Sequence, residues 1–298
     1  MFSKLFAESG LSLDRLKSLL EVGAAGSIVK AAGGDPVRQS QYSRQIKELE
    51  DFFRIKLIER QGKGTQLTPN GKELARISRF FMLGLSNFQR GCLAEEQTFR
   101  IGAGATFSRQ FLLPVLSAAQ KSGASHATEV VSDGEIERRL HDLTLDFGIV
   151  GSAEISRPLQ TKILGQWKLE LWIPRALGLN EAGARRSFQE QRLPLVLAGN
   201  ELAGLAVPEL EKYPAKLTCH DFLEARTALE EKNLGAFLPD FIAANKMPKA
   251  FMQIRILKID ARTFPFFLAW NPRLLRLNPH ATCERDLLAQ LLSWQLAR

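Results

Sequence analysis

Residues 38–50 read RQSQYSRQIKELE, and this stretch decides how the fold of the chain is interpreted. Its apolar residues recur with the period of one buried helical face. They are Tyr42, Ile46 and Leu49, followed by Phe53. At about 100° per residue, the opposite face carries Ser40, Gln41, Arg44 and Lys47. Such a polar face suits base edges and phosphates. Most charged helical faces are only solvated, so the neighbouring sequence has to decide between the two interpretations.

The residues before this stretch predict a helix-turn-helix. One face of a first helix, which ends between residues 23 and 26, carries Leu13, Leu16, Leu20 and Gly23. Ser27 is a favourable N-cap for a short second helix over residues 28–32. Gly33-Gly34-Asp35-Pro36 is turn chemistry that ends this helix. Two short helices joined by a glycine-bearing turn, the second with outward Gln and Arg, are typical of this DNA-binding motif.

The residues after the stretch predict a β-hairpin. Residues 56–60 and 66–68 read as strands, joined by the basic turn Gln61-Gly62-Lys63-Gly64-Thr65. A hairpin placed directly behind a helix-turn-helix is a wing that can lie along a phosphate backbone. The turn does not match a P-loop, because Leu57 stands where that motif requires its first glycine.

The charge of the chain is concentrated in this region. The whole chain has a net charge of +8, and residues 27–79 hold 11 Lys or Arg against 6 Asp or Glu, which leaves +5 in this short segment. Basic charge gathered on a small domain is the electrostatic footprint of a nucleic-acid binder. Together with the flanking turn and hairpin, it makes a merely solvated helix face a poor explanation.

The order and spacing of these pieces resemble the winged helix-turn-helix of LysR-type transcriptional regulators. The matching residues are Gly26-Ser27-Ile28, Ala31-Ala32, Ser43-Arg44-Gln45-Ile46, Leu49-Glu50, Arg60, Gly62, Gly64, Leu67-Thr68-Pro69 and Gly71. Where that family usually has Ser-Gln-Pro-Ala, this chain has Arg38-Gln39-Ser40-Gln41. The resemblance therefore implies the fold without naming the operator sequence.

The resemblance also implies which residues contact DNA. The amino end of the recognition helix reads bases in that family, which indicates Gln39, Ser40, Gln41 and Arg44 here. Contacts to phosphates are implied for Ser27, Arg38, Ser43, Lys47, Lys63 and Thr65.

A long amphipathic helix is predicted after the hairpin, with Thr68 as its cap and Pro69 in its first turn. Apolar residues follow a short coiled-coil spacing; they are Leu74, Ile77, Phe81 and Phe88, with Leu85 beside the seam. The helix could pack on its own domain. In the resembled family it pairs with its twin, so we expect a homodimer or homotetramer that binds an imperfect palindrome in double-stranded DNA.

From residue 99 onward, short apolar runs alternate with helical stretches, which predicts an α/β domain. Strands are expected at residues 99–101, 127–131, 147–150, 169–173, 193–198, 217, 235–239, 253–259 and 264–270. Helices are expected after residue 111, over residues 133–143, from Asp221 and over residues 284–296.

The turn that we expect at Gly102-Ala103-Gly104 resembles a dinucleotide-binding loop only in part. Phe107 stands where its third glycine would be, and no acid follows at the required distance. The sequence around it resembles the effector domain of LysR-type regulators instead, in Ile101-Gly102-Ala103, Leu112-Leu113-Pro114, Asp146-Phe147-Gly148-Ile149 and residues 235–239. That domain has two α/β subdomains with a cleft between them, as in periplasmic binding proteins.

The expected fold is therefore α/β with an all-α-plus-wing head. The expected domains are a DNA-binding domain over residues 11–69, a linker helix over 70–97 and an effector domain over 98–298. Within the last, one subdomain comprises residues 98–165 and 262–298, and the other residues 166–261.

Helix starts and hydroxyls hold small anions in such clefts, so the expected effector is an organic anion. The candidate residues are Thr106, Phe107, Ser108, Ser132, Gly199, Asn200 and Asn271. Each of them could equally serve only as a cap or turn residue.

The sequence does not indicate catalysis, a metal or a cofactor. The four histidines lack HExxH or other metal spacing, and there is no GxSxG. The three cysteines form no CxxC pair or disulfide framework. No signal peptide or membrane span is apparent, so we expect a cytoplasmic, nucleoid-associated regulator. Two alternatives remain open: a nucleotide-utilising α/β enzyme whose basic head docks it on nucleic acid, and a regulator whose pocket is empty.

Overall fold

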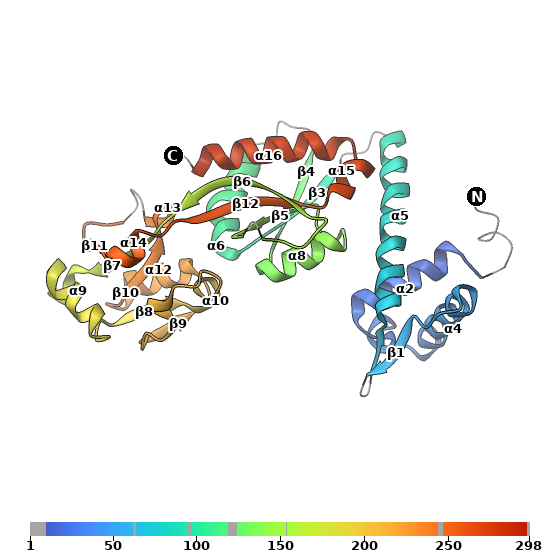
Figure 1. The fold of residues 1–298 in the computed structure, drawn as a ribbon, viewed down its shortest axis with the longest axis horizontal. Helices are drawn as coiled ribbons and strands as arrows, with labels where there is room; N and C mark the ends of the chain where they lie inside the picture. The colour runs from blue at the N-terminus through green and yellow to red at the C-terminus, as the bar shows by residue number, and fades with distance from the viewer. Residues whose placement is uncertain are drawn as a thin grey trace. The chain divides into compact units, whose positions relative to one another are not determined.

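A computed structural model of the protein describes residues 10–61, 64–93, 97–118, 124–152, 154–243 and 247–296. The chain divides into two compact units, Met1–Ala94 and Glu95–Arg298. Figure 1 shows both units with their helices and strands, and each is described by itself.

The first unit is a small helical head with a hairpin and a long last helix. Its elements are α2 (Leu13–Ala25), α3 (Ile28–Ala31), α4 (Pro36–Phe53), β1 (Ile58–Gln61), β2 (Gly64–Leu67) and α5 (Pro69–Leu93). β1 and β2 pair antiparallel, and Gln61 lies opposite Gly64. The helix-turn-helix and the hairpin predicted from the sequence are therefore present.

The core of the head is built from one face of each helix, as the spacing in α4 predicts. Its buried residues are Leu16, Leu19, Val22, Ile28, Ala32, Tyr42, Ile46, Leu49, Leu57 and Ala75. Each fully buried Leu or Ile stabilises the fold by about 1.5–3 kcal/mol. The predicted face of the first helix was partly wrong, because Leu13 is 52% exposed, whereas Leu19 and Val22 are buried. The face is rotated towards these two residues because α4 and α5 both pack against α2.

The turn between α3 and α4 depends on two consecutive glycines. Gly33 has φ +61° and Gly34 has φ +85°, both in the left-handed region. Glycine adopts this region at no steric cost, whereas other residues do so only under strain. The turn brings α4 back across α2 and α3, which leaves the polar face of α4 outside.

One face of α5 contacts the head and the other is exposed. Leu74 and Met82 pack against the head core. Four apolar side chains are exposed on the outer face: Ile77, Phe81, Leu85 and Phe88, the last at 73%. Leu74, which was expected in the seam, thus packs on its own domain. Pairing of the exposed face with a second copy stays a prediction.

The second unit has two five-stranded sheets. The first has the order β4-β3-β5-β12-β6. Its strands are β3 (Thr98–Ala103), β4 (Ser125–Val130), β5 (Phe147–Val150), β6 (Gln160–Trp167) and β12 (Phe264–Trp270). β3 is parallel to β4 and β5, whereas β12 is antiparallel to β5 and β6. The accompanying helical segments are α6 (Ala105–Phe107), the π-helical turn η1 (Ser108–Leu112), α7 (Leu113–Ala118), α8 (Asp133–His141), α15 (Pro272–Leu277) and α16 (His280–Leu296).

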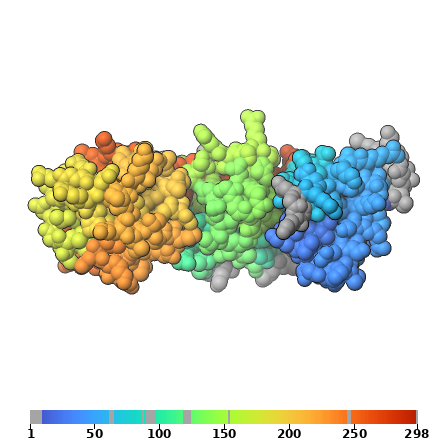
Figure 2. All heavy atoms as spheres, turned by 90° about the horizontal axis from the view of Figure 1, so that it is seen from below, coloured from blue at the N-terminus to red at the C-terminus, as the bar shows by residue number. Residues whose placement is uncertain are grey.

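The second sheet has the order β11-β7-β10-β8-β9. Its strands are β7 (Leu169–Pro174), β8 (Leu195–Ala198), β9 (Leu217–Cys219), β10 (Gly235–Pro239) and β11 (Phe251–Ile254). Its helical segments are η3 (Arg175–Leu177), α9 (Glu181–Gln189), α10 (Gly199–Ala203), α11 (Pro208–Glu211), α12 (Phe222–Glu231), α13 (Asp240–Ala243) and α14 (Leu257–Asp260). The chain passes from the first sheet to the second between β6 and β7, and returns between α14 and β12. In Figure 2 these two parts of the second unit are adjoining lobes, coloured mainly green and mainly yellow to orange.

Three sequence expectations for this unit were wrong. The strand expected over residues 253–259 ends at Ile254, and Leu257–Asp260 forms the helical turn α14. No strand was expected where β6 lies. Gly102 and Ala103 belong to strand β3 rather than to a turn. At Gly102 an added Cβ would stand 2.6 Å from Leu145, so close packing accounts for this glycine without a nucleotide loop.

Candidate DNA-reading face and effector cavity

The start of α4 is set by a cap that the sequence interpretation used only as a turn. Asp35 is the N-cap, and its carboxylate accepts the N–H of Val37 at 2.8 Å. Pro36 occupies the first helical position, where the missing N–H costs nothing. α4 therefore begins at Pro36, and residues 38–41 lie in its first turns.

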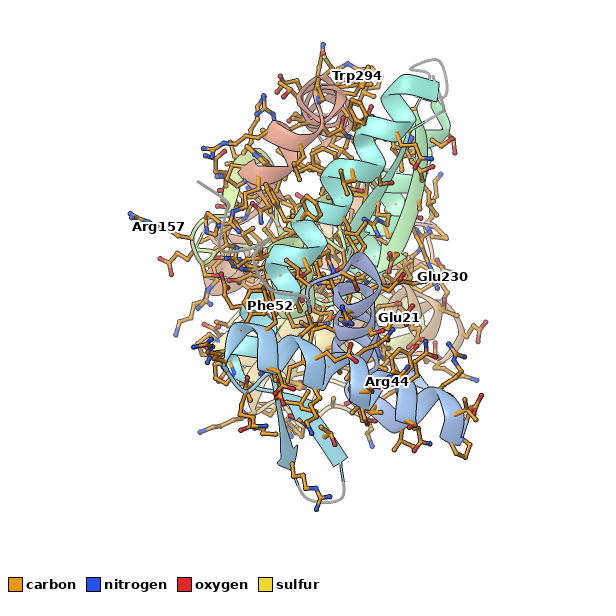
Figure 3. The ribbon with its side chains drawn as sticks, turned by 90° about the vertical axis from the view of Figure 1, so that its right-hand side faces the viewer. Glu21, Arg44, Phe52, Arg157, Glu230 and Trp294 are labelled. Carbon is orange, nitrogen blue, oxygen red and sulfur yellow. The ribbon has the colours of Figure 1, made fainter. Side chains whose placement is uncertain are left out.

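The polar face of α4 is open to solvent. Ser40, Gln41, Arg44 and Lys47 are exposed, as are Arg38 and Ser43, and Gln39 is half-buried. Among the described residues, Arg44 has no hydrogen-bond or ion-pair partner. Figures 1 and 3 show α4 and the hairpin at one end of the head, and Figure 3 labels Arg44 on the helix. Guanidinium and amide groups are the side chains best suited to bidentate contacts with guanine and adenine.

The buried side of α4 is fixed by polar contacts to α2. The hydroxyl of Tyr42 donates to Glu21 at 2.6 Å, and Arg38 Nη2 donates to the same hydroxyl at 3.4 Å. The bond to Glu21 and burial raise the pKa of Tyr42. Ser18 donates to Gln45 as well. These contacts hold the polar face in one orientation. They also place the Arg38 guanidinium beside Tyr42, one turn further along α4.

The hairpin is held against α4 by Glu50. This buried carboxylate accepts the N–H of Leu57 at 2.8 Å and that of Ile58 at 3.2 Å, and it pairs with Lys56 at 3.1 Å. Burial would raise the pKa of Glu50, but these bonds together hold it below its ordinary value. In the sequence, Glu50 stands out only as part of the family pattern. Its partners lie beyond the end of α4, so the helical spacing does not reveal its role.

The expected phosphate contacts fall on several elements. The Oγ of Ser27 accepts the N–H of Lys30 at 3.2 Å as the N-cap of α3, which leaves its proton free to donate. Thr65 lies on β2 opposite Arg60. Lys63 lies outside the described residues.

Sequence reasoning missed Val37 at the tip of α4. Its side chain is 76% exposed beside the cap. An exposed apolar residue at this place is a candidate for contact with a thymine methyl group. The only signal in the sequence was its position directly after Asp35-Pro36, which marks the first turn of a helix.

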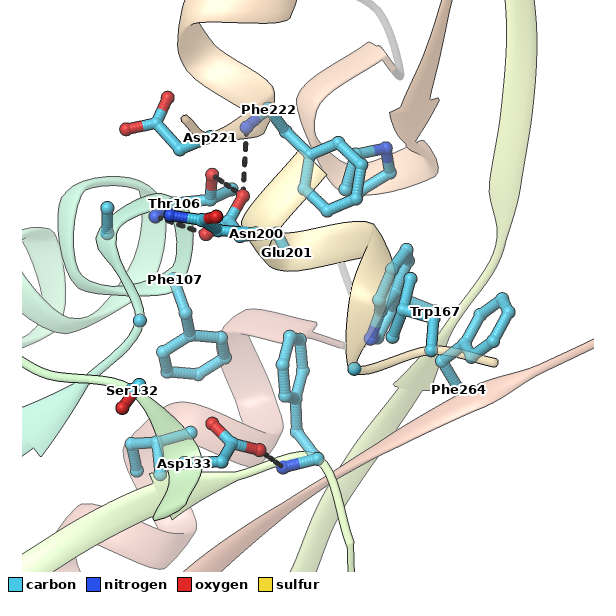
Figure 4. A pocket seen from close by; sticks show the side chains of 18 of the residues that line it. Thr106, Phe107, Ser132, Asp133, Trp167, Asn200, Glu201, Asp221, Phe222 and Phe264 are labelled. Atoms are coloured by element: carbon cyan, nitrogen blue, oxygen red, sulfur yellow. Dashed lines mark hydrogen bonds between the residues drawn. The ribbon is translucent and has the colours of Figure 1, made fainter. Parts of the chain in front are cut away.

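The second unit contains a cavity of about 760 Å³ between its two lobes. It is lined by the residues that follow β3, β4 and β5 in the first lobe, and by the starts of α10 and α12 in the second. The connecting strands close it with Trp167, Phe264 and Phe266. Figure 4 shows the cavity from close by.

Four of the seven expected effector residues line this cavity: Thr106, Phe107, Ser132 and Asn200. Ser108 and Gly199 are not part of its lining. Asn271 is 2% exposed and lies elsewhere, where it accepts the N–H of Arg273 at 3.0 Å and donates to the carbonyl of Leu140 at 3.2 Å. It caps α15 and ties it to α8.

A carboxylate that the sequence did not indicate joins the two lobes at the cavity. Glu201 on α10 accepts the N–H of Thr106 at 3.1 Å and its hydroxyl at 2.6 Å. It also accepts the N–H of Phe222, the first residue of α12, at 2.8 Å. These dashed contacts converge on Glu201 in Figure 4. Thr106 and Glu201 are 95 positions apart, so no local pattern could have paired them.

Two further carboxylates line the cavity. Asp221 caps α12 and accepts the N–H of Glu224 at 2.8 Å. Asp133, at the start of α8, accepts the N–H of Gly151 at 2.9 Å. Its side chain faces the open cavity but is closely surrounded by protein atoms, and this desolvation raises the pKa of Asp133. Asn200 bonds His220 at 3.0 Å on the same rim.

Comparison with known families decides the identity of both units. Residues 13–72 match the model of the bacterial regulatory helix-turn-helix protein, lysR family, and residues 94–292 match the LysR substrate binding domain. The chain belongs to the LysR family. The LysR-family resemblance of the sequence is therefore confirmed, and so is the predicted fold class. This protein is a DNA-binding transcriptional regulator with a LysR substrate-binding domain.

Solved structures of full-length LysR regulators share its fold. Full-length OxyR from Pseudomonas aeruginosa aligns with a TM-score of 0.65 and 18% identity over 96% of this chain and 99% of that one. ArgP from Mycobacterium tuberculosis aligns with a TM-score of 0.63 and 16% identity over 90% and 96%. LysG from Corynebacterium glutamicum, with arginine bound as effector, aligns with a TM-score of 0.56 and 16% identity over 92% and 99%.

A comparison with curated proteins gave no match for this LysR regulator. Among the helices that the structure describes, none is long and apolar enough to cross a bilayer.

Proposed function

We propose that this LysR-type regulator reads its operator with the amino end of α4 and responds to a small molecule in the cavity between its lobes. The observation that carries the DNA assignment is the solvent-exposed polar face of α4, with Arg44 available for bonding, beside the hairpin. Base contacts come from Gln39, Ser40, Gln41 and Arg44, with Val37 added against a thymine methyl group.

Phosphate contacts surround this face in the proposal. They come from Ser27, Arg38, Ser43, Lys47, Lys63 and Thr65. Cationic contacts release counterions from DNA, so binding weakens steeply as salt rises. The Ser27 hydroxyl supports the assignment, because its oxygen is occupied as a cap while its proton remains available.

The regulator acts as a homodimer or as a pair of dimers on an imperfect palindrome. The exposed stripe on α5 supports this arrangement: Ile77, Phe81, Leu85 and Phe88 project from one side of the helix. Four large apolar side chains on one exposed helical face are typical of a helix that pairs with a partner.

The protein acts as a regulator rather than as an enzyme, at the DNA of the cytoplasmic nucleoid. The regulator assignment is supported by Gly102, which lies in a strand packed on Leu145, so that close packing accounts for this glycine without a nucleotide loop. The effector-response residues in the cavity are Thr106, Phe107, Ser132 and Asn200, joined by Glu201.

An operator-selection experiment on the full chain tests the DNA assignment. After selection from random duplexes, specific and nonspecific affinities are measured by gel shift for the wild type and Arg44→Ala. The loss of a bidentate base contact costs about 1–3 kcal/mol, so specific affinity should fall about tenfold or more while nonspecific binding changes little. Arg186→Ala, which removes an arginine from α9, is the matched control. Unchanged specific binding by Arg44→Ala contradicts the assignment.

A further inference from the structure

Glu201 occupies the place in the cavity where a bound carboxylate would be expected. Its two oxygens accept the N–H and hydroxyl of Thr106 from one lobe and the N–H of Phe222 from the other. Thr106 is 3% exposed and is the second residue of α6, the helical segment that follows β3. Helix starts with free N–H groups are the favoured sites of anions. Here the protein supplies that anion itself.

The other charges of the cavity have the same sign. Its described lining carries the carboxylates of Asp133, Glu201 and Asp221 and contains no Lys or Arg. This contrasts with the +8 of the whole chain. An organic anion would enter a partly desolvated space that already holds three carboxylates, where like charges repel more strongly than in water. A cation would be attracted.

The carboxylates do not form a metal site. Within the described part of the chain, no group of three His, Cys, Asp or Glu side chains is arranged to hold a metal ion. The acidic groups are instead distributed over α8, α10 and the start of α12. The cation that fits them is therefore an organic one.

Aromatic side chains form a large part of the remaining lining. The rings of Phe107 and Phe266 meet edge to face, with their centroids 4.4 Å apart. The ring centroid of Trp167 lies 4.8 Å from that of Phe264 and 6.0 Å from that of Phe222. Phe241 lies 5.7 Å from the same Trp167. Aromatic faces attract ammonium and guanidinium groups, and they also bury apolar surface. Aromatic rings next to carboxylates are suited to a molecule with a cationic head and an apolar body.

We propose that the cavity binds an amphipathic organic cation, a primary amine or guanidinium on an aromatic or branched apolar body, with Glu201 and Asp133 as its charge partners. The proposal rests on the function proposed above for this cavity, and it departs from the expected organic anion because the anion position is already filled. Glu201 acts as the specificity-determining residue. It blocks carboxylates and, since it bonds both lobes, links recognition of the cation to their relative position.

Asp133 is the second charge partner because one of its oxygens is available. Oδ2 accepts the N–H of Gly151, and among the described residues nothing donates to Oδ1. Asp221, the cap of α12, is only 5% exposed, whereas Glu201 is half-buried, so burial leaves Asp221 to contribute charge rather than contact.

Isothermal titration calorimetry on the full chain tests the proposal. The probes are 2-phenylethylamine and 3-phenylpropionate, which share a phenyl ring and a short chain but carry opposite charges. One charge contact in a partly solvated cavity is worth about a factor of ten or more in affinity, so the amine should bind at least about tenfold more tightly than the acid.

Two variants locate the effect. Glu201→Gln should weaken the amine and strengthen the acid, which reverses or removes the preference. Asp133→Asn leaves the contacts of Glu201 intact and should weaken the amine alone. Glu211→Gln, an exposed acid on α11 outside the cavity, should change neither. Near-ultraviolet circular dichroism verifies that each variant keeps its tertiary structure.

The proposal is overturned if the amine fails to bind at millimolar concentration, if the acid binds wild-type protein more tightly, or if the preference survives both cavity variants. Operator binding is measured on the same preparation by gel shift. A protein that binds its operator but prefers the acid contradicts only the ligand class. A protein that binds the amine but no operator contradicts the proposed DNA function instead.

Discussion

Gly71, in the first turn of α5, lies so close to Leu57 that a Cβ built on it would stand 2.1 Å from the carbonyl oxygen of Leu57. No side chain fits there without moving the backbone. Thr68 strengthens the same junction, because its hydroxyl donates to the carbonyl of Lys56 at 2.8 Å and accepts the N–H of Gly71 at 3.0 Å. The start of α5 is thus bonded to the residues that lead into the hairpin.

Gly71→Ala should destabilise the head, because either α5 or the Leu57 segment has to shift. We expect the free energy of unfolding to fall by roughly 3 kcal/mol, measured by thermal unfolding of the full chain. Gly134→Ala on α8 is the control, since nothing lies within 4 Å of its added Cβ. In a helix that substitution should stabilise by roughly 0.5 kcal/mol. A Gly71→Ala variant as stable as wild type contradicts the close approach.

Glu50→Gln should loosen the hairpin. Two backbone N–H groups and Lys56 are bonded to this carboxylate, and the amide can replace only part of them. A loss of about 1–3 kcal/mol is expected, measured by chemical denaturation of the full chain. Glu59→Gln, an exposed acid on β1, should change little.

The pH dependence of stability distinguishes the charge of Glu50 from its shape. Its folded-state pKa lies below the ordinary value of 4.5. The contribution of the Glu50 charge to the free energy of unfolding is therefore fully present above the unfolded-state pKa. It is lost as the pH falls through the folded-state pKa. Chemical denaturation from neutral pH down through this range should show a steeper loss in wild type than in Glu50→Gln. Parallel curves would indicate that the charge does not matter.

Phe81→Asp should dissociate the oligomer that we expect in solution, which lowers the mass of the sedimenting species. Phe81 lies in the middle of the exposed apolar stripe of α5, and a buried unpaired carboxylate at a helix–helix seam opposes association. Sedimentation velocity should show monomer for the variant and a larger species for wild type. Leu257→Asp places the same charge on another exposed apolar residue, at 77% exposure, and should leave the mass unchanged. If Phe81→Asp retains the wild-type mass, the stripe is not the dimer seam.

The sequence predicted those parts of the fold whose signals are local. The Ser27 cap, the Gly33-Gly34 turn and the spacing from Tyr42 to Leu49 are each complete within a few residues. β10 and β12 were predicted with the bounds that the structure has, because each is a continuous apolar run. β6 was missed because only two of its eight residues are buried. α14 was taken for strand because one helical turn is too short to show a helical period.

The cavity could be predicted only in part, because some of its contacts join residues that are far apart in the sequence. Thr106, Ser132 and Asn200 follow strands or start helices, which is visible in the sequence. Glu201 looks like any acid in the first turn of a helix, and only the approach of the two lobes makes it a bridge between Thr106 and Phe222. Asn271 had the same local signature, yet its amide is used to cap α15. Sequence patterns locate helix starts, but the contacts of each start depend on packing between distant segments.

Cys219 should be a poorly reactive thiol although it lies near the cavity rim. Burial and the neighbouring acids Glu224 and Asp221 raise its pKa to about 11, and its Sγ lies 3.5 Å from the carbonyl of Leu197. At pH 8 roughly one molecule in a thousand then carries the thiolate, which is the form that reacts. Iodoacetamide labelling followed by peptide mass spectrometry should show slow modification of Cys219 and fast modification of the exposed Cys283. The rate at Cys219 should still rise above pH 9. Equal labelling of both cysteines at pH 8 would show that the thiol is neither desolvated nor held by its carbonyl partners.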